Sequence, residues 1–213
     1  MLFRSGLNDL AKRESVRQTI LSTHATLVCL QETKIMNWTN DLLKDTVGYK
    51  LAKQTAHLPS IGASGGILIA CDEDFFDITP VTYASTYSLS VRVSSRLEDV
   101  VWDLTAVYGP QQENEKMCFL SELCSISNLM KPEWLILGDF NMIRRVREKN
   151  KGAINKRVMR KFNQTIDALQ LLELDLIGKK FTWSNEHDDP TMSRIDRLMA
   201  TTEWHGLYPA ANL

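Results

Sequence analysis

The sequence predicts an α+β fold in which two packed sheets are flanked by helices. Strand-like alternation recurs between residues 26 and 108, and two helical patterns then separate the remaining strands. Runs of strands interrupted by helices favour such layers over a parallel, doubly wound sheet. No linker, repeat or low-complexity tract interrupts the 213 residues, so we predict a single domain over residues 1–213.

Three helices are predicted from apolar residues at helical spacing. Residues 12–22 carry Val16 and Ile20 among charges, and residues 113–128 and 156–172 repeat this pattern. The predicted strands cover residues 26–31, 48–52, 65–71, 75–81, 87–93, 100–108, 134–138, 181–183 and 194–199. The strands before residue 109 are expected to be mainly antiparallel.

Composition excludes several classes of protein. The 25 Lys and Arg balance 26 Asp and Glu to a net charge of -1, so any nucleic-acid-binding surface must be local. The longest apolar run, residues 67–71, is far shorter than the roughly 18 residues of a membrane span, and residues 1–8 do not resemble a signal peptide. Four cysteines without a CxxC pair, three of them in apolar patterns, predict buried, reduced thiols of an intracellular protein.

The most informative local pattern is WLILGDFN, in which a buried strand ends just before Asp139 and Asn141. Side chains two residues apart in extended backbone point the same way. A carboxylate and an amide placed together could orient a water molecule and a phosphate oxygen. An Asx turn that ends the strand would explain the same two residues equally well.

Three other predicted strands carry polar residues, two of them at the end of the strand. Glu32 follows residues 26–31, although a solvated loop is the usual place for a glutamate. Tyr108 ends residues 100–108, and its phenol could donate to a phosphate or simply contact water. Asp196 lies within RIDRLM and faces away from Ile195. Each of these signals is weak alone.

Together these motifs resemble those of the endonuclease/exonuclease/phosphatase superfamily. The matching motifs, in chain order, are CLQETK (29–34), SGG (64–66), VYGP (107–110), GDFN (138–141), FTWSN (181–185) and SRIDR (193–197). The chain is most similar to the apurinic-endonuclease-like domain of LINE-type retrotransposons, particularly those of plants. The resemblance covers nearly the whole chain.

The resemblance implies a four-layered α/β/β/α sandwich and a Mg²⁺- or Mn²⁺-dependent phosphodiesterase that nicks DNA in the nucleus. Glu32 matches the metal-binding glutamate of that family. Asp139 and Asn141 match the pair that orients the attacking water and the phosphate. Tyr108 matches the tyrosine that contacts the phosphate, and Asp196 matches the aspartate that supports the catalytic histidine.

Electrostatics gives a separate reason to expect a cation. Two carboxylates about 5 Å apart repel by roughly 3 kcal/mol at an effective dielectric near 20, so a cluster of Glu32, Asp139 and Asp196 needs a divalent ion or a proton. Oxygen ligands without Cys or His suit Mg²⁺ or Mn²⁺.

The chain departs from the family pattern at both ends. Phe3 stands where the family has an asparagine, and no Ser-Asp-His motif follows Asp196 before Leu213. We therefore expect incomplete terminal strands and impaired catalysis, with none of the four histidines in the expected context. Two alternatives stay open: a catalytically silent remnant that binds nucleic acid or a partner, and a phosphoesterase acting on small molecules.

A basic stretch follows the GDFN motif. Residues 144–161 contain nine Lys or Arg residues and only Glu148 as an acid, a local charge of +8. Arg144, Arg145, Arg147 and Lys149 are the predicted DNA contacts, because this stretch begins three residues after Asn141. A merely solvated loop and helix face is the alternative.

Overall fold

The structure is a computed structural model that describes residues 2–4, 6–62, 64–81, 85–185 and 187–213. The side chains of residues 2–4 are not described, so the prediction concerning Phe3 lies outside the described residues. The chain forms two compact units. The first comprises Met1–Ala84 and Ser88–Tyr108, and the second comprises Ser85–Tyr87 and Gly109–Leu213. Each unit is described by itself.

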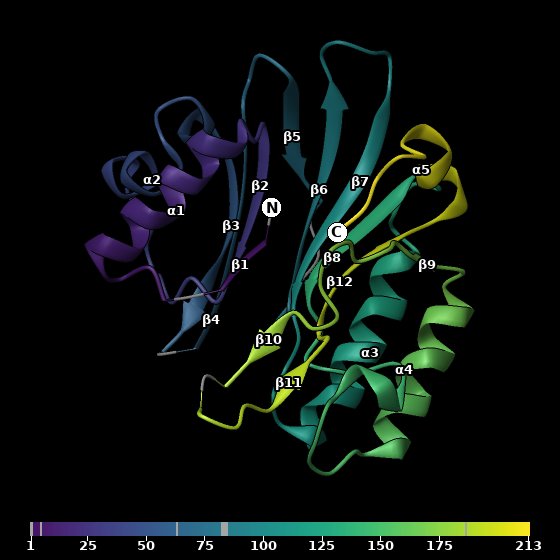
Figure 1. The fold of residues 1–213 in the computed structure, drawn as a ribbon. Coiled ribbons are helices and arrows are strands. Elements are labelled where there is room, and N and C mark those ends of the chain that lie inside the picture. Colours follow the sequence, from purple (N-terminus) through teal and green to yellow (C-terminus); the bar gives the residue numbers. More distant parts are fainter. Residues whose placement is uncertain (1, 5, 63, 82–84, 186) are drawn as a thin grey trace. The chain divides into compact units, whose positions relative to one another are not determined.

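The first unit contains a four-stranded sheet, a three-stranded meander and two α-helices (Figure 1). Its elements are β1 (Leu2–Arg4), α1 (Leu10–Thr23), β2 (Leu27–Gln31), α2 (Asn40–Val47), the 3₁₀ helix η1 (Leu51–Lys53), β3 (Gln54–Ile61), β4 (Ser64–Cys71), β5 (Phe76–Pro80), β6 (Ser88–Ser95) and β7 (Val101–Tyr108). The first sheet has the strand order β1-β2-β4-β3, with β1 parallel to β2 and the other pairs antiparallel. Strands β5, β6 and β7 form an antiparallel meander.

Helices and strands share one core on the outer face of the first sheet. Val16 and Ile20 of α1 and Leu43 of α2 are buried against Val28 of β2 and Leu68 of β4. The β5-β6-β7 meander contacts β2, β3 and β4. Alternate side chains of a strand point to opposite faces, and most residues of β2 and β4 are buried, so both strands bury both of their faces.

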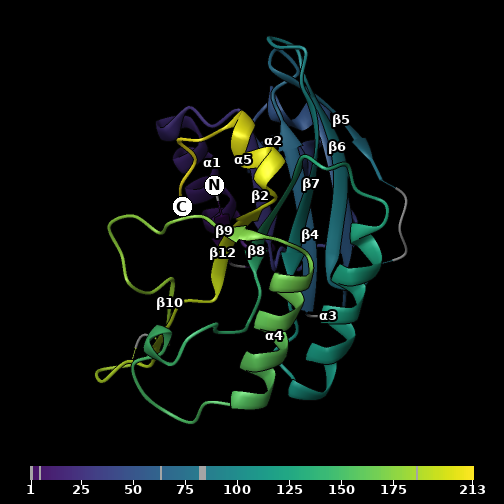
Figure 2. The same cartoon turned by 90° about the vertical axis from the view of Figure 1, so that its right-hand side faces the viewer.

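The second unit contains strands β8, β12 and β9, the two-stranded sheet β10-β11 and three α-helices. Its elements are α3 (Glu113–Ser127), β8 (Trp134–Asp139), the 3₁₀ helix η2 (Val146–Glu148), α4 (Lys156–Ala168), β9 (Leu172–Glu173), β10 (Trp183–Ser184), β11 (Met192–Ser193), β12 (Asp196–Ala200) and α5 (Thr202–Leu207). Strand β12 is antiparallel to both β8 and β9, and β10 pairs with β11. Helices α3 and α4 lie side by side (Figure 2). Three rings, Phe119, Phe140 and Phe162, connect these helices to the end of β8.

The described residues thus have a mixed α+β fold with two packed sheets and five α-helices, which confirms the predicted class. None of the described helices is long and apolar enough to cross a membrane.

Several predicted elements were wrong. Residues 48–52 are not a strand, because the chain there leaves α2 and forms η1. Helix α2 and the edge strand β3 were missed. Cys124 is exposed rather than buried, because the buried face of α3 consists of Phe119, Leu120, Leu123 and Ile126. All four cysteines are free, and only Cys29 and Cys71 are buried.

Candidate active site

Two predicted carboxylates are neighbours in the second unit. Asp139 ends β8, Asp196 begins β12, and the antiparallel register pairs them directly. The side chains of directly opposed residues share a face, with Cβ atoms about 4.5–5.5 Å apart. Asp139 is 2% exposed and Asp196 is 7% exposed. Two acids are therefore held close together and largely out of water.

Asn141 is fixed beside this pair by two hydrogen bonds. Its backbone N–H donates to Oδ1 of Asp139 at 2.8 Å, which is the Asx turn considered from the sequence. Its Nδ2 donates to the carbonyl oxygen of Gly109 at 2.7 Å. Asn141 adopts a left-handed backbone with φ of 50°, a conformation that asparagine tolerates better than most residues. The Asx turn and the candidate site are thus the same structure.

The backbone of Gly109 also contacts the turn formed by residues 139–141. Its N–H donates to the carbonyl oxygen of Asp139 at 2.6 Å. A Cβ at this position would lie 2.5 Å from the carbonyl oxygen of Phe140, so only glycine permits this close approach. The glycine of VYGP and the turn of GDFN are therefore in direct contact.

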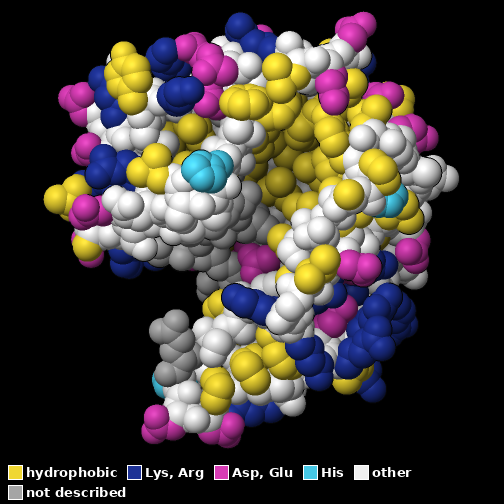
Figure 3. Space-filling view, turned by 45° about the horizontal axis from the view of Figure 1, so that its top comes forward, with side chains coloured by type: hydrophobic (Ala, Val, Ile, Leu, Met, Phe, Trp, Pro, Cys, Tyr) yellow, Lys and Arg dark blue, Asp and Glu magenta, His cyan; other side chains and the backbone are white. Residues whose placement is uncertain are grey.

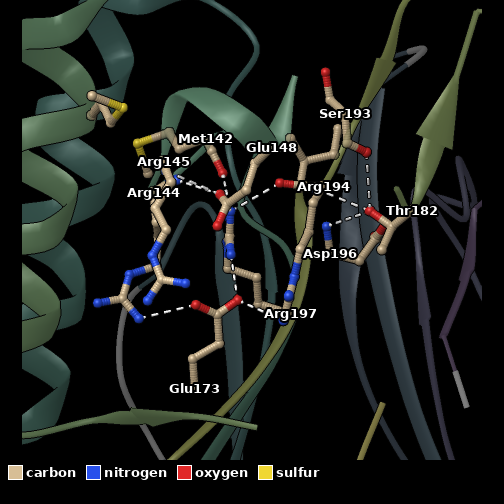
Figure 4. A network of polar contacts seen from close by, with 12 residues as sticks. Met142, Arg144, Arg145, Glu148, Glu173, Thr182, Ser193, Arg194, Asp196 and Arg197 are labelled. Carbon is tan, nitrogen blue, oxygen red and sulfur yellow. Dashed lines mark hydrogen bonds and ion pairs between the residues drawn. The ribbon is translucent and has the colours of Figure 1, made fainter. Parts of the chain in front are cut away.

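Thr182 of the FTWSN motif fixes the start of β12. Its Oγ1 accepts hydrogen bonds from the N–H groups of Ile195 and Asp196, each at 3.0 Å. Figure 4 shows this hydroxyl beside Asp196 and Ser193. The FTWSN and SRIDR motifs thus set the backbone from which the Asp196 carboxylate projects.

The other two predicted site residues belong to the first unit. Glu32 follows β2 with φ of 53°, and Oε1 of its half-buried side chain lies 3.2 Å from Nζ of Lys34. The N–H groups of Thr33 and Lys34 donate to the carbonyl oxygens of Gly66 and Gly65, so CLQETK and SGG are in contact. Tyr108 ends β7 and is partly exposed. The second unit therefore brings Asp139, Asn141 and Asp196 together, and Glu32 and Tyr108 are placed within the first.

The predicted DNA-contacting residues differ in their surroundings. Arg145 and Arg147 are exposed. Nζ of Lys149 donates to the carbonyl oxygen of Ala153 at 2.9 Å. Arg144 is mostly buried, and its guanidinium donates to Asn163 at 2.8 Å and to Glu173 at 3.0 Å. Arg144 thus anchors the start of the basic stretch to α4 and β9.

A buried ion cluster lies next to the site and was missed from the sequence. Arg197 is 0% exposed, and its guanidinium donates to Glu173 and, at 2.5 Å, to Glu148. It also donates to the carbonyl oxygen of Arg194 at 2.9 Å (Figure 4). The guanidinium lies over the Phe162 ring, 5.8 Å from the ring centroid. The only signal in the sequence was a charged residue, Arg197, directly before the apolar end of the strand, Leu198–Ala200. The cluster fixes β9, β12 and the basic stretch to one another.

Glu148 gives this cluster a pH dependence. Burial disfavours its carboxylate, but the charge and hydrogen bond of Arg197 and the N–H groups of Arg144 and Arg145 outweigh burial. The pKa of Glu148 therefore falls below its ordinary value of 4.5. The stability that Glu148 contributes is fully present above about pH 4.5 and is lost as the pH falls through the lower, folded-state pKa.

We expect Glu148→Gln to flatten the fall in unfolding free energy on acidification, measured by urea unfolding between about pH 3 and pH 7. The exposed Glu98→Gln is the matched control and should keep the acid slope of the parent chain. An unchanged slope in Glu148→Gln would contradict the lowered pKa.

The family model described as "Endonuclease/Exonuclease/phosphatase family" matches residues 1–211. The chain belongs to this family. The endonuclease/exonuclease/phosphatase family comprises phosphodiesterases and nucleases, and its members generally depend on divalent metals. The resemblance inferred from the six motifs is therefore confirmed. No curated protein sequence matches the chain.

Several solved structures share the fold of the chain. The endonuclease domain of TRAS1, a telomere-specific non-LTR retrotransposon, is 15% identical, with a TM-score of 0.67 over 95% of this chain and 85% of that chain. The Xenopus laevis APE2 catalytic domain is 16% identical, with a TM-score of 0.54 over 93% and 81%. D. rerio TDP2 complexed with single strand DNA product is 11% identical, with a TM-score of 0.60 over 94% and 81%. The predicted sandwich fold is thereby confirmed.

The residues of the second unit fit part of the metal site expected in this family. Asp139 and Asp196 supply carboxylate oxygens, and Mg²⁺ commonly takes one or two carboxylates while keeping several waters. Within the described ranges, no three His, Cys, Asp or Glu side chains form a group able to hold a metal ion. Two carboxylates therefore offer a partial ligand set.

Proposed function

We propose that the chain is a divalent-metal-dependent phosphodiesterase that hydrolyses the DNA backbone, as in the endonuclease domains of LINE-type retrotransposons. The observation that carries the proposal is the register pairing of Asp139 with Asp196 beside Asn141. Two buried acids and an amide fixed by Gly109 thus lie together at the ends of two adjacent strands. Such arrangements are typical of sites that orient water and phosphate.

Each residue has a proposed role. Asp139 accepts a hydrogen bond from the attacking water and aligns it with phosphorus, and Asn141 holds a phosphate oxygen. Asp196, which is paired with Asp139 in the strand register, offers a second carboxylate beside the attacking water. Glu32 and Tyr108 enter the proposal through their motif positions, as metal ligand and phosphate contact. A bound Mg²⁺ or Mn²⁺ would neutralise the charge that develops on the phosphate oxygens.

The proposal assigns the DNA backbone to the exposed Arg145 and Arg147 and to Lys149, which is partly exposed. The structure of TDP2 with a single strand DNA product supports DNA as the ligand class. The proposal gives the histidines no role. His205, for example, lies in α5, which follows Ala200, and Ala200 is at the opposite end of β12 from Asp196. The impaired catalysis expected from the sequence stays a prediction.

Nicking of supercoiled plasmid DNA tests the proposal. We expect nicking in Mg²⁺ or Mn²⁺, none with a chelator, and a loss of roughly 100-fold in Asp139→Asn, in line with the loss of a general base. The matched control is Asp99→Asn, which removes an exposed carboxylate from the turn after β6 and should nick normally.

Three outcomes would contradict the proposal. Undiminished nicking by Asp139→Asn would remove the proposed site. DNA binding without metal-dependent nicking would instead support the catalytically silent remnant. Hydrolysis of a small phosphodiester without plasmid nicking would support the small-molecule phosphoesterase.

A further inference from the structure

Helix α4 carries a compact set of unpaired cations. Four basic side chains, all exposed, occupy its first six residues: Lys156, Arg157, Arg160 and Lys161. None of the four has an ion-pair partner among the described residues of the chain. Lys and Arg side chains gather on the right of Figure 3, the side on which Figure 1 places α4. We call these four side chains the α4 cation face.

The α4 cation face is unfavourable for the isolated protein. Lys156 with Arg160, and Arg157 with Lys161, are like charges spaced i,i+4, which repel. The first turn of α4 contains no acidic residue, so cations stand at the positive end of the helix dipole. The chain as a whole has a net charge of -1, so this concentration is local. Binding a polyanion would relieve both repulsions.

The opposite face of α4 is fixed to the candidate active site. Phe162 and Ile166 are fully buried. The Phe162 ring lies 5.4 Å from the ring of Phe140, the residue between Asp139 and Asn141. At the start of the helix, Nδ2 of Asn155 donates to Glu113 of α3 at 2.7 Å. The cations therefore project from a support that also holds the Asp139 turn.

The length of the cation face suits a nucleic-acid backbone. From Lys156 to Lys161 the helix rises about 7.5 Å at 1.5 Å per residue. One DNA strand rises about 3.4 Å per nucleotide, so the face spans roughly two phosphates. Flexible Lys and Arg side chains can extend this reach.

We propose that the α4 cation face binds the phosphate backbone of duplex DNA, outside the region contacted by Arg145 and Arg147. The inference rests on the proposed function for its ligand class. It adds a second, sequence-independent contact surface that does not touch the reacting phosphate. Arg144 is not part of this surface, because its guanidinium already donates hydrogen bonds to Asn163 of α4 and to Glu173 of β9.

The test is the salt dependence of duplex binding by the full chain, measured by fluorescence anisotropy with a chelator present. We expect the double variant R160Q/K161Q to bind more weakly. The slope of log affinity against log salt should fall by about 0.9 for each lost phosphate contact, or about 1.8 for both. A matched double variant, K12Q/K44Q on α1 and α2, should change neither affinity nor slope.

Because no metal is present, the binding result does not depend on nicking, and failure of the nicking test leaves this result interpretable. R160Q/K161Q should melt at or above the temperature of the parent chain, since it removes repulsion, so weaker binding could not be attributed to unfolding. An unchanged slope, or an equal loss in K12Q/K44Q, would overturn the proposal. So would a preference for anionic phosphatidylserine vesicles over duplex DNA that disappears in R160Q/K161Q.

Discussion

An Arg197→Ala variant is expected to lose about 3–5 kcal/mol of unfolding free energy, the usual cost of removing one partner from a buried ion pair. Arg197 is fully buried, and its guanidinium contacts both Glu148 and Glu173. Glu173 would still be contacted by Arg144 and Arg194. Glu148 would keep only backbone N–H donors for a carboxylate that is almost out of water. Urea unfolding followed by circular dichroism measures the loss.

The same cluster provides the controls. Arg147→Ala removes an exposed arginine from the same stretch and should stay within about 0.5 kcal/mol of the parent chain. Adding Glu148→Gln to Arg197→Ala should recover part of the loss, because the unpaired buried carboxylate is then gone. A loss below about 1 kcal/mol in Arg197→Ala would mean that the cluster contributes little to stability.

Strands with two buried faces could be predicted from the sequence, and strands at the edge of a sheet could not. Residues 65–71 and 134–138 are continuous apolar runs, and they form β4 and β8 almost as predicted. Strand β3 lies at the edge of its sheet and mixes buried with exposed side chains, so its pattern is weak. Helix α2 has only eight residues, too few for a periodic signal to stand out.

In the candidate site, the sequence likewise predicted which residues are polar but not which of them are in contact. The sequence placed Asp139 after a buried strand and Asp196 within the strand RIDRLM, but their pairing depends on the register between β8 and β12, which tertiary packing decides. Arg197 was missed because a charged side chain is rarely fully buried, and the acids that pair with it come from distant segments. Arg144 was assigned to DNA for the same reason: the sequence shows its charge and not its partners.

A Gly109→Ala variant is expected to damage both folding and catalysis. The added Cβ would lie 2.5 Å from the carbonyl oxygen and 2.8 Å from the carbonyl carbon of Phe140. Both are backbone atoms, so the chain between Asp139 and Asn141 must shift to make room. Overpacking of this kind costs about 1–3 kcal/mol. A displacement of about 1 Å at a catalytic group can lower the rate roughly 100-fold.

Gly206→Ala is the matched control for Gly109→Ala. No atom lies within 4 Å of the position of its added Cβ, and Gly206 is in helix α5. Replacing a helical glycine by alanine should stabilise the chain by up to about 1 kcal/mol. Thermal melting and plasmid nicking, measured on both variants, separate the effect of position from that of the methyl group. If Gly109→Ala melts and nicks like the parent chain, then the contact between VYGP and GDFN does not hold the turn. If it loses nicking and keeps its stability, then the turn serves the site more than the fold.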